Sequence, residues 1–204
     1  MSKRFTFVAA LVGAAMVAPS LLAGETSKAD RDKLVDHLKK TEAAFLKAID
    51  GVSDAQWTWK PAPDRWSVAE AAEHITKSED LFLGMAEGTL KTPATPEILA
   101  KTKGKEETIL KVIPDRTQKA KAPEPLVPKG SFASRAALIE AFKASRAKLL
   151  ALAGGTTDLR AHAAAGPPLG EMDTYQVILF QSAHTERHTK QIDEVKATAG
   201  YPAR

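Results

Sequence analysis

Two histidines near the carboxyl end of the chain, His184 and His188, have the type and the spacing of metal ligands. Residues four apart on a helix leave the same face one turn from each other, so both imidazole rings can reach one ion. They also occupy turns where the buried face of an amphipathic helix would normally carry leucine. The spacing alone fits two interpretations, a shared metal ion or two hydrogen-bonded core histidines.

A third histidine, His74, favours the metal interpretation. It lies on a second predicted helix between Ala71 and Ser78, which are small enough to leave room beside an imidazole. Burying three histidines separately would be costly, because each ring nitrogen would need its own hydrogen-bond partner. One divalent ion satisfies the three rings together, and three ligands leave a fourth coordination position open, as in catalytic sites. We therefore predict that His74, His184 and His188 bind one divalent metal ion.

The composition limits the chemistry further. The 204 residues include no cysteine, which excludes disulfides, thiolate zinc sites, iron–sulfur clusters and cysteine nucleophiles. Three imidazole ligands suit zinc, nickel, copper or iron, and we expect zinc or nickel first. The formal net charge of +4 falls to +2 without Lys3 and Arg4, which is too little for a nucleic-acid-binding face. We expect no nucleic-acid partner.

Hydrophobic periodicity predicts that helices position these histidines. Apolar residues recur at alternating steps of four and three along four segments, as in amphipathic helices. The segments are 34–52, 67–88, 134–155 and 173–200. Ser67, Ser134 and Asp173 are well placed to cap the last three. Strand patterns are absent, so we expect an all-α four-helix bundle over residues 24–204.

A long proline-rich connection separates the second and third predicted helices. Residues 92–130 contain six prolines and many lysines, and we expect short helices around 96–101 and 105–113. A connection this long in a compact domain is usually functional or disordered. We expect the remainder to form a long ordered loop or a mobile cover.

The amino-terminal segment has the order of a secretory signal peptide. Lys3 and Arg4 precede an almost wholly apolar run that starts at Phe5, and small residues follow up to Ala23. We expect residues 1–23 to be removed and the protein to be exported, periplasmic or extracellular, with no stable membrane association after cleavage. An uncleaved anchor is the alternative, because the run is nearly long enough to span a bilayer.

Two stretches of the sequence resemble one known family. Residues 59–75, with Trp66-Ser67 and Glu73-His74, are similar to the start of the second helix in the DinB-like family, described as metal-dependent hydrolases and thiol transferases. Residues 183–192 are similar to the closing H-x-x-x-H helix of that family. The resemblance covers about residues 30–198.

The resemblance implies an up-down-down-up bundle that holds a divalent ion with one histidine of the second helix and two of the fourth. Carried over position by position, these ligands are His74, His184 and His188. Some members move a low-molecular-weight thiol onto an electrophile, and one branch isomerises a thiol adduct. Known thiol transferases of this kind work in the cytosol, whereas this chain is expected to be exported. The resemblance therefore implies the site more directly than the substrate.

Three polar residues of the fourth helix lie close to the histidine pair in sequence. Glu186 follows His184 by two positions, about 200° around a helix, so we expect it to point away from the metal. Gln181 and Gln191 each lie one turn outside the pair. Two interpretations fit these glutamines. In the first, they hydrogen-bond a metal-bound water or orient a histidine. In the second, they are ordinary polar residues near the solvent-exposed end of the bundle.

Four further residues have simple structural interpretations. We expect Glu73 to face solvent or an adjacent helix, and Trp66 to pack at the start of its helix. His37, on a polar helix face, and His162, in a loop rich in glycine and proline, are expected at the surface.

The leading functional prediction is an exported metal-dependent enzyme that hydrolyses a small molecule or transfers a group to it. The catalytic residues and the substrate are not identified by the sequence. One alternative is a bundle that binds metal without catalysis, for ion handling or interaction, and another is a bundle whose histidines only hydrogen-bond. A homodimer is one assembly that the sequence allows. Metal analysis of purified protein tests whether the histidines bind metal or only hydrogen-bond. If they bind metal, a turnover assay distinguishes an enzyme from a bundle without catalysis.

Overall fold

The computed structural model describes residues 24–166 and 168–203. The predicted signal peptide, residues 1–23, lies outside the described residues. Helices dominate the described part of the chain, which contains seven α-helices, two 3-10 helices and one short two-stranded sheet. The prediction of an all-α fold is confirmed.

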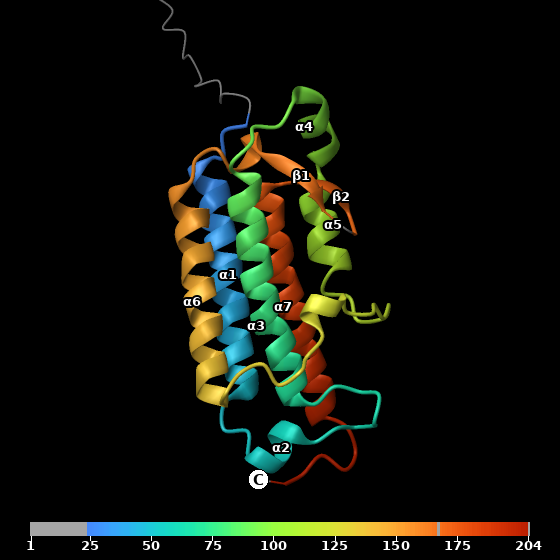
Figure 1. Ribbon diagram of the computed structural model, residues 1–204. Helices are drawn as coiled ribbons and strands as arrows, with labels where there is room; N and C mark the ends of the chain where they lie inside the picture. Colours follow the sequence, from blue (N-terminus) through green and yellow to red (C-terminus); the bar gives the residue numbers. More distant parts are fainter. Residues whose placement is uncertain (1–23, 167, 204) are drawn as a thin grey trace, which may run out of the picture.

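Four of the described helices are long and lie side by side (Figure 1). They are α1 (Lys28–Ile49), α3 (Val68–Thr89), α6 (Arg135–Gly155) and α7 (Thr174–Lys196). Helices α1 and α3 each pack against both α6 and α7, so α1 and α3 lie on opposite corners. Helices α1 and α7 run in one direction and α3 and α6 in the other, which is the up-down-down-up order (Figure 1).

The predicted caps begin three of the long helices. Ser67 Oγ accepts from Glu70 N at 3.1 Å, and Ser67 N donates to Glu70 Oε2 at 2.8 Å, which completes a capping box. Asp173 and Gln176 form a second capping box at the start of α7. Ser134 caps α6 through its side-chain oxygen. These local hydrogen bonds place the helix starts where the sequence predicts them.

Apolar stripes of the four long helices form the core. The largest fully buried apolar side chains of these helices include Leu34, Leu38, Phe45, Ile75, Phe142, Leu149, Ile178 and Ile192. Because these residues recur at the predicted steps of three and four, packing follows the sequence pattern closely.

The connection between α3 and α6 contains the two short helices that the sequence predicts. Helix α4 spans Pro96–Thr102 and α5 spans Lys105–Val112, and a 3-10 turn, η1, spans Glu124–Leu126. Helix α5 packs on α7, and η1 packs on α3. The connection therefore lies along the two helices that carry the histidines (Figure 1).

Four further short elements were not predicted. Helix α2 (Asp54–Thr58) and the 3-10 turn η2 (Leu159–Ala161) lie between long helices. The strands β1 (Ala163–Gly166) and β2 (Gly170–Asp173) pair antiparallel in a part of the chain where the sequence shows no strand pattern. Neither strand has an alternating apolar pattern, and tertiary contacts support the hairpin. Lys105 Nζ donates to Leu169 O at 2.7 Å and to Glu171 O at 2.5 Å.

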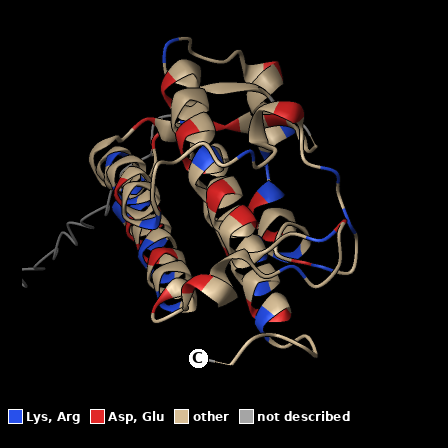
Figure 2. Ribbon diagram, turned by 60° about the horizontal axis from the view of Figure 1, so that its bottom comes forward, with Lys and Arg blue, Asp and Glu red and all other residues tan. Residues whose placement is uncertain are grey.

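Charged residues of both signs are interspersed along the long helices (Figure 2). None of the helices in residues 24–166 and 168–203 combines the length and apolar character needed to cross a bilayer. The absence of a nucleic-acid partner stays a prediction.

Candidate metal centre

The structure brings the three predicted ligands together between α3 and α7. One ligand atom from each of His74, His184 and His188 lies within 4.8 Å of the others. Nε2 of His74 is 3.3 Å from Nε2 of His184, and the three ring centroids lie 4.3–5.0 Å apart. Helix α7 supplies two rings from successive turns, and the facing turn of α3 supplies the third.

Hydrogen bonds outside the cluster orient two of the rings. Nδ1 of His74 is 2.8 Å from Leu126 O, and Nδ1 of His188 is 2.8 Å from Gln191 Oε1. Both partners are acceptors, so each Nδ1 carries the proton and each Nε2 keeps its lone pair. This arrangement is typical of histidine ligands, whose second nitrogen donates to a carbonyl or carboxylate. Gln191 therefore orients a histidine, one of the two roles predicted for it.

Burial keeps the three rings neutral. His74 is 2% exposed and His188 is 7% exposed. Burial lowers the pKa of His184 to about 3, and the positive charge that the neighbouring His74 and Arg187 would place beside a protonated ring lowers it in the same direction. Burial lowers the pKa of His188 well below its ordinary value and also lowers that of His74. Neutral imidazole is the form that coordinates metal.

The donor set fits a divalent ion better than a hydrogen-bonded cluster. The rings could form one hydrogen bond among themselves, between His74 and His184. That bond leaves Nδ1 of His184 buried without a partner among the described residues. Three nitrogen donors at this separation match the nitrogen ligands of zinc and of similar transition metals.

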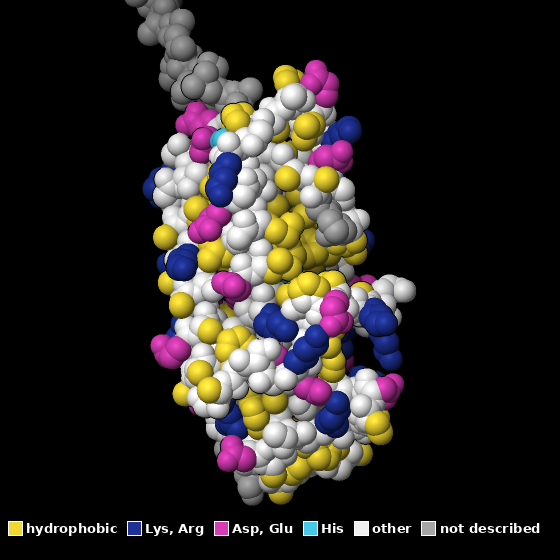
Figure 3. Space-filling view, viewed as in Figure 1, with side chains coloured by type: hydrophobic (Ala, Val, Ile, Leu, Met, Phe, Trp, Pro, Cys, Tyr) yellow, Lys and Arg dark blue, Asp and Glu magenta, His cyan; other side chains and the backbone are white. Residues whose placement is uncertain are grey.

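Aromatic side chains surround the histidines. The Trp66 ring lies 4.8 Å from the His74 ring and 6.0 Å from that of His188. Phe82 and Phe180 stack at 5.1 Å, and the Phe180 ring is nearly parallel to that of His184. Hydrophobic side chains also gather on the face between α3, α5 and the β hairpin (Figure 3). Trp66 packs against the site at the start of its helix, where the sequence predicted a packing role.

Glu73 is buried, contrary to one of its two expected positions, and it contacts the connection instead of an adjacent long helix. Its side chain accepts hydrogen bonds from the backbone N–H groups of Lys129, Gly130 and Ser131. Burial alone would raise the pKa of Glu73, but these donors outweigh burial and leave the pKa below its ordinary value. The expectation of solvent or a neighbouring helix is wrong, because the partner is a loop more than 50 residues away in sequence.

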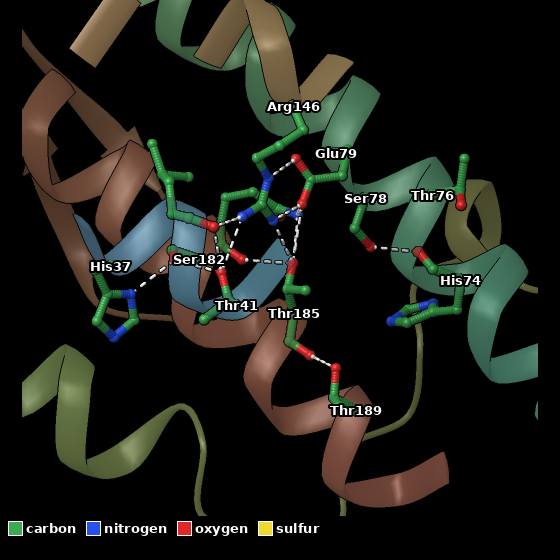
Figure 4. Close-up of polar contacts among 12 residues, drawn as sticks. His37, Thr41, His74, Thr76, Ser78, Glu79, Arg146, Ser182, Thr185 and Thr189 are labelled. Carbon is green, nitrogen blue, oxygen red and sulfur yellow. Dashed lines mark hydrogen bonds and ion pairs between the residues drawn. The ribbon is translucent and has the colours of Figure 1, made fainter. Parts of the chain in front are cut away.

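A buried ion pair between Arg146 and Glu79 is the main feature that the sequence analysis missed. Both side chains are fully buried, and Arg146 Nε lies 3.0 Å from Glu79 Oε2 (Figure 4). Arg146 also donates to Leu38 O and to the hydroxyls of Thr41 and Thr185. The one available signal was the place of Arg146 beside the apolar stripe of its helix.

Gln181 belongs to this polar network and not to the metal centre. Its Nε2 donates to Glu79 Oε1 at 2.7 Å and to Thr185 Oγ1 at 3.3 Å. The Nε2 group of Gln181 is therefore bonded within the bundle, and a contact between Gln181 and a metal-bound water stays a hypothesis. Its position one turn before His184 instead faces the centre of the bundle.

The other two histidines lie outside the cluster, but neither is a simple surface residue. His37 is half-buried, with Nδ1 2.7 Å from Ser182 Oγ (Figure 4). His162 is 8% exposed, and its Nε2 is 3.2 Å from Asp158 Oδ2. Both surface expectations are wrong, because loops and neighbouring helices cover these rings. Glu186 contacts Lys190 and lies 4.0 Å from His37, and it is not part of the cluster, as predicted.

Comparisons with known proteins agree with this geometry. The family model described as the DinB superfamily matches residues 37–192. An uncharacterized protein of Bacillus subtilis (strain 168), YuaE, is 29% identical over 149 residues, which cover 72% of this chain and 88% of that protein. No solved structure matches the chain. The family match includes all three histidines.

Proposed function

Because this chain belongs to the DinB superfamily, we propose that it binds one divalent metal ion through His74, His184 and His188. The observation that carries this proposal is the convergence of three neutral imidazoles within 4.8 Å. Zinc or nickel is the metal that we propose first, on ligand type.

We further propose that the site performs hydrolysis or group transfer on a small molecule. A bound divalent ion with three protein ligands would supply a Lewis acid and an activated water or nucleophile at its open position. Leu126 O and Gln191 Oε1 hold protons on the outward nitrogens of His74 and His188. Trp66 and the stacked pair Phe82 and Phe180 place apolar rings beside the histidine cluster.

A second candidate function is metal binding without catalysis. The carboxylates on α3 nearest to the cluster are committed to structural partners: Glu73 holds the connection, and Glu79 pairs with Arg146. Neither is free to act as a general base, which favours ion handling or an interaction role if no turnover is found.

The metal content of purified protein tests the proposal. We expect about one ion per chain in the protein as isolated or after reloading a chelator-treated sample, and a rise in melting temperature on loading. A chain that holds no stoichiometric zinc, nickel, copper or iron under either condition would contradict it. Loaded and chelated samples compared on ester and thiol-transfer substrates then separate an enzyme from the second candidate.

We also propose that the protein is exported, on the pattern of residues 3–23. An exported protein would meet a thiol cosubstrate of the cytosol only before export. Hydrolysis therefore stands ahead of thiol transfer among the proposed reactions.

A further inference from the structure

Residues 129–131 of the connection form a backbone nest around the Glu73 carboxylate. The N–H groups of Lys129, Gly130 and Ser131 donate to it at 2.9, 2.8 and 3.1 Å, and Ser131 Oγ donates at 2.8 Å. Gly130 has a φ of +70°, which L residues rarely adopt and which lets successive N–H groups converge on one anion. Glu73 is buried, with 5% of its surface exposed.

The same stretch of connection reaches the metal centre three residues earlier. Leu126 O accepts from His74 Nδ1 at 2.8 Å, and Val127 O accepts from Lys77 Nζ at 2.9 Å. Glu73, His74 and Lys77 are neighbours on one side of α3. Their side chains therefore hydrogen-bond residues 126–131 of the connection at several adjacent points. Leu126 itself is buried at the end of η1.

The orientation of His74 depends on where Leu126 O lies. A neutral imidazole carries its proton on either nitrogen, and a fixed acceptor at Nδ1 selects the form whose Nε2 is free to bind. Leu126 O is not held by a regular strand or a long helix, so its place depends on the anchors on either side of it. On the carboxyl side, these anchors are the contact of Val127 O with Lys77 and the nest at 129–131.

We propose that Glu73 is a positioning residue for His74. By holding residues 129–131, it keeps Leu126 O opposite Nδ1 of His74 and keeps Nε2 directed at His184 and His188. The effect on metal affinity rests on the proposed function, whereas the effect on the His74 proton concerns the metal-free protein and does not.

Two variants weaken the hydrogen bonds of the nest, one by changing the acceptor Glu73 and the other by changing the donor backbone at Gly130. Glu73→Gln keeps the size of the side chain but replaces one acceptor oxygen with a donor group, so part of the nest loses its partner. Gly130→Ala leaves Glu73 intact, and the added Cβ meets no atom within 4 Å, but alanine disfavours the positive φ. Gly104→Ala is the matched control, since Gly104 lies on the same connection with a φ of +74° and equally open space, outside the nest.

Nitrogen-15 NMR of histidine-labelled, metal-free protein gives the first readout. In the parent and in Gly104→Ala, we expect His74 to show a single form with the proton on Nδ1. In Glu73→Gln and Gly130→Ala, we expect a mixture of the two neutral forms, together with faster hydrogen exchange of the amides at 129–131. A structural role confined to stability would change the exchange rates and leave the proton on Nδ1.

Zinc affinity from chelator competition gives the second readout. We expect both nest variants to bind about 10- to 100-fold more weakly than the parent, the usual effect of losing a hydrogen bond behind a ligand, and Gly104→Ala to match the parent. Faster exchange at 129–131 with an unchanged His74 proton and unchanged affinity would overturn the inference. If Glu73→Gln fails to fold, Gly130→Ala decides the matter. If the parent binds none of zinc, nickel, copper and iron, the proposed function fails, and the NMR result still decides the role of Glu73.

Discussion

His74 and His188 are buried and His184 is partly buried, and this burial keeps the three imidazoles neutral. One ligand atom of each ring lies within 4.8 Å of those of the other two, so an ion held by two of them would also meet the third. His37 and His162 are also partly or largely buried, yet each pairs with a single neighbouring side chain. Burial alone therefore does not define the site, and convergence does.

Alanine substitution of the five histidines tests this distinction. Because His74, His184 and His188 contribute to one site, each single substitution is expected to remove most of the metal affinity and not a third of it. His37→Ala and His162→Ala should keep parental affinity while lowering stability, since each removes a hydrogen bond. Metal content and ion-induced thermal shift measure the outcome. Parental affinity in His74→Ala together with loss in His184→Ala would reduce the site to a pair on α7.

At the scale of elements, the start of α7 carries an unusual cap. Asp173 is 2% exposed, and its carboxylate accepts from Gln176 N at 2.8 Å and from Arg160 Nη1 at 3.2 Å. Burial outweighs these donors and raises the pKa of Asp173 to about 6. The folded state therefore holds this proton more tightly than the unfolded chain does. The stability from protonated Asp173 is complete below the ordinary pKa of 3.8 and is lost as the pH rises through about 6.

Asp173→Asn should remove this pH dependence. Asparagine keeps an oxygen that caps Gln176 N and stays uncharged at every pH. The stability of the variant relative to the parent should rise by about 2 kcal/mol between pH 4 and pH 7, at 1.36 kcal/mol for each unit of pKa shift. Urea unfolding of both proteins across this range measures the difference. An equal difference at both pH values would show that the carboxyl titrates normally in the fold.

At the scale of the whole molecule, Arg146 and Glu79 connect all four long helices. Arg146 of α6 reaches Glu79 of α3, Leu38 O and Thr41 of α1, and Thr185 of α7. Thr185 directly follows His184, and it donates to Glu79, so this network joins α7 to α3 next to the histidine cluster (Figure 4). A buried pair with this many partners specifies how the helices meet.

Breaking the pair should destabilise the fold strongly. Arg146→Met is expected to cost about 3–5 kcal/mol in the free energy of unfolding, because it leaves the Glu79 charge buried without its partner. The double variant Glu79→Leu with Arg146→Met should be less destabilised than the sum of the two single variants. Lys143→Met, at an exposed position of α6, is the control and should leave stability unchanged. Additive losses in the double-mutant cycle would show that the two groups do not interact.

Export is a second prediction at this scale. We expect the mature protein to begin near Gly24 and to lie outside the cytoplasm, because a basic start precedes an apolar run and small residues. Fractionation followed by mass spectrometry of the amino terminus measures both. Intact Met1 on protein recovered from the cytoplasm would contradict the prediction, and intact Met1 on membrane-bound protein would favour the uncleaved anchor.

The helices, their caps and the shared face of His184 and His188 were predictable because they depend on local information. Apolar residues at steps of three and four decide which face of a helix is buried, and Ser67 and Asp173 cap through contacts within three residues. His184 and His188 share a face by helical geometry alone. The two short helices in the connection also follow from local breaks at proline and glycine.

The remaining features depended on partners that are distant in sequence. The Glu73 carboxylate accepts hydrogen bonds from backbone N–H groups 56–58 residues away in sequence. Glu79 pairs with Arg146, which is 67 residues away in sequence. The β hairpin has no strand pattern of its own and is held by Lys105. A buried polar residue resembles an exposed one in sequence, because only its tertiary partner makes its burial favourable. Which nitrogen of His74 is directed at His184 was likewise decided by Leu126 O, a loop carbonyl that only the folded chain brings to the ring.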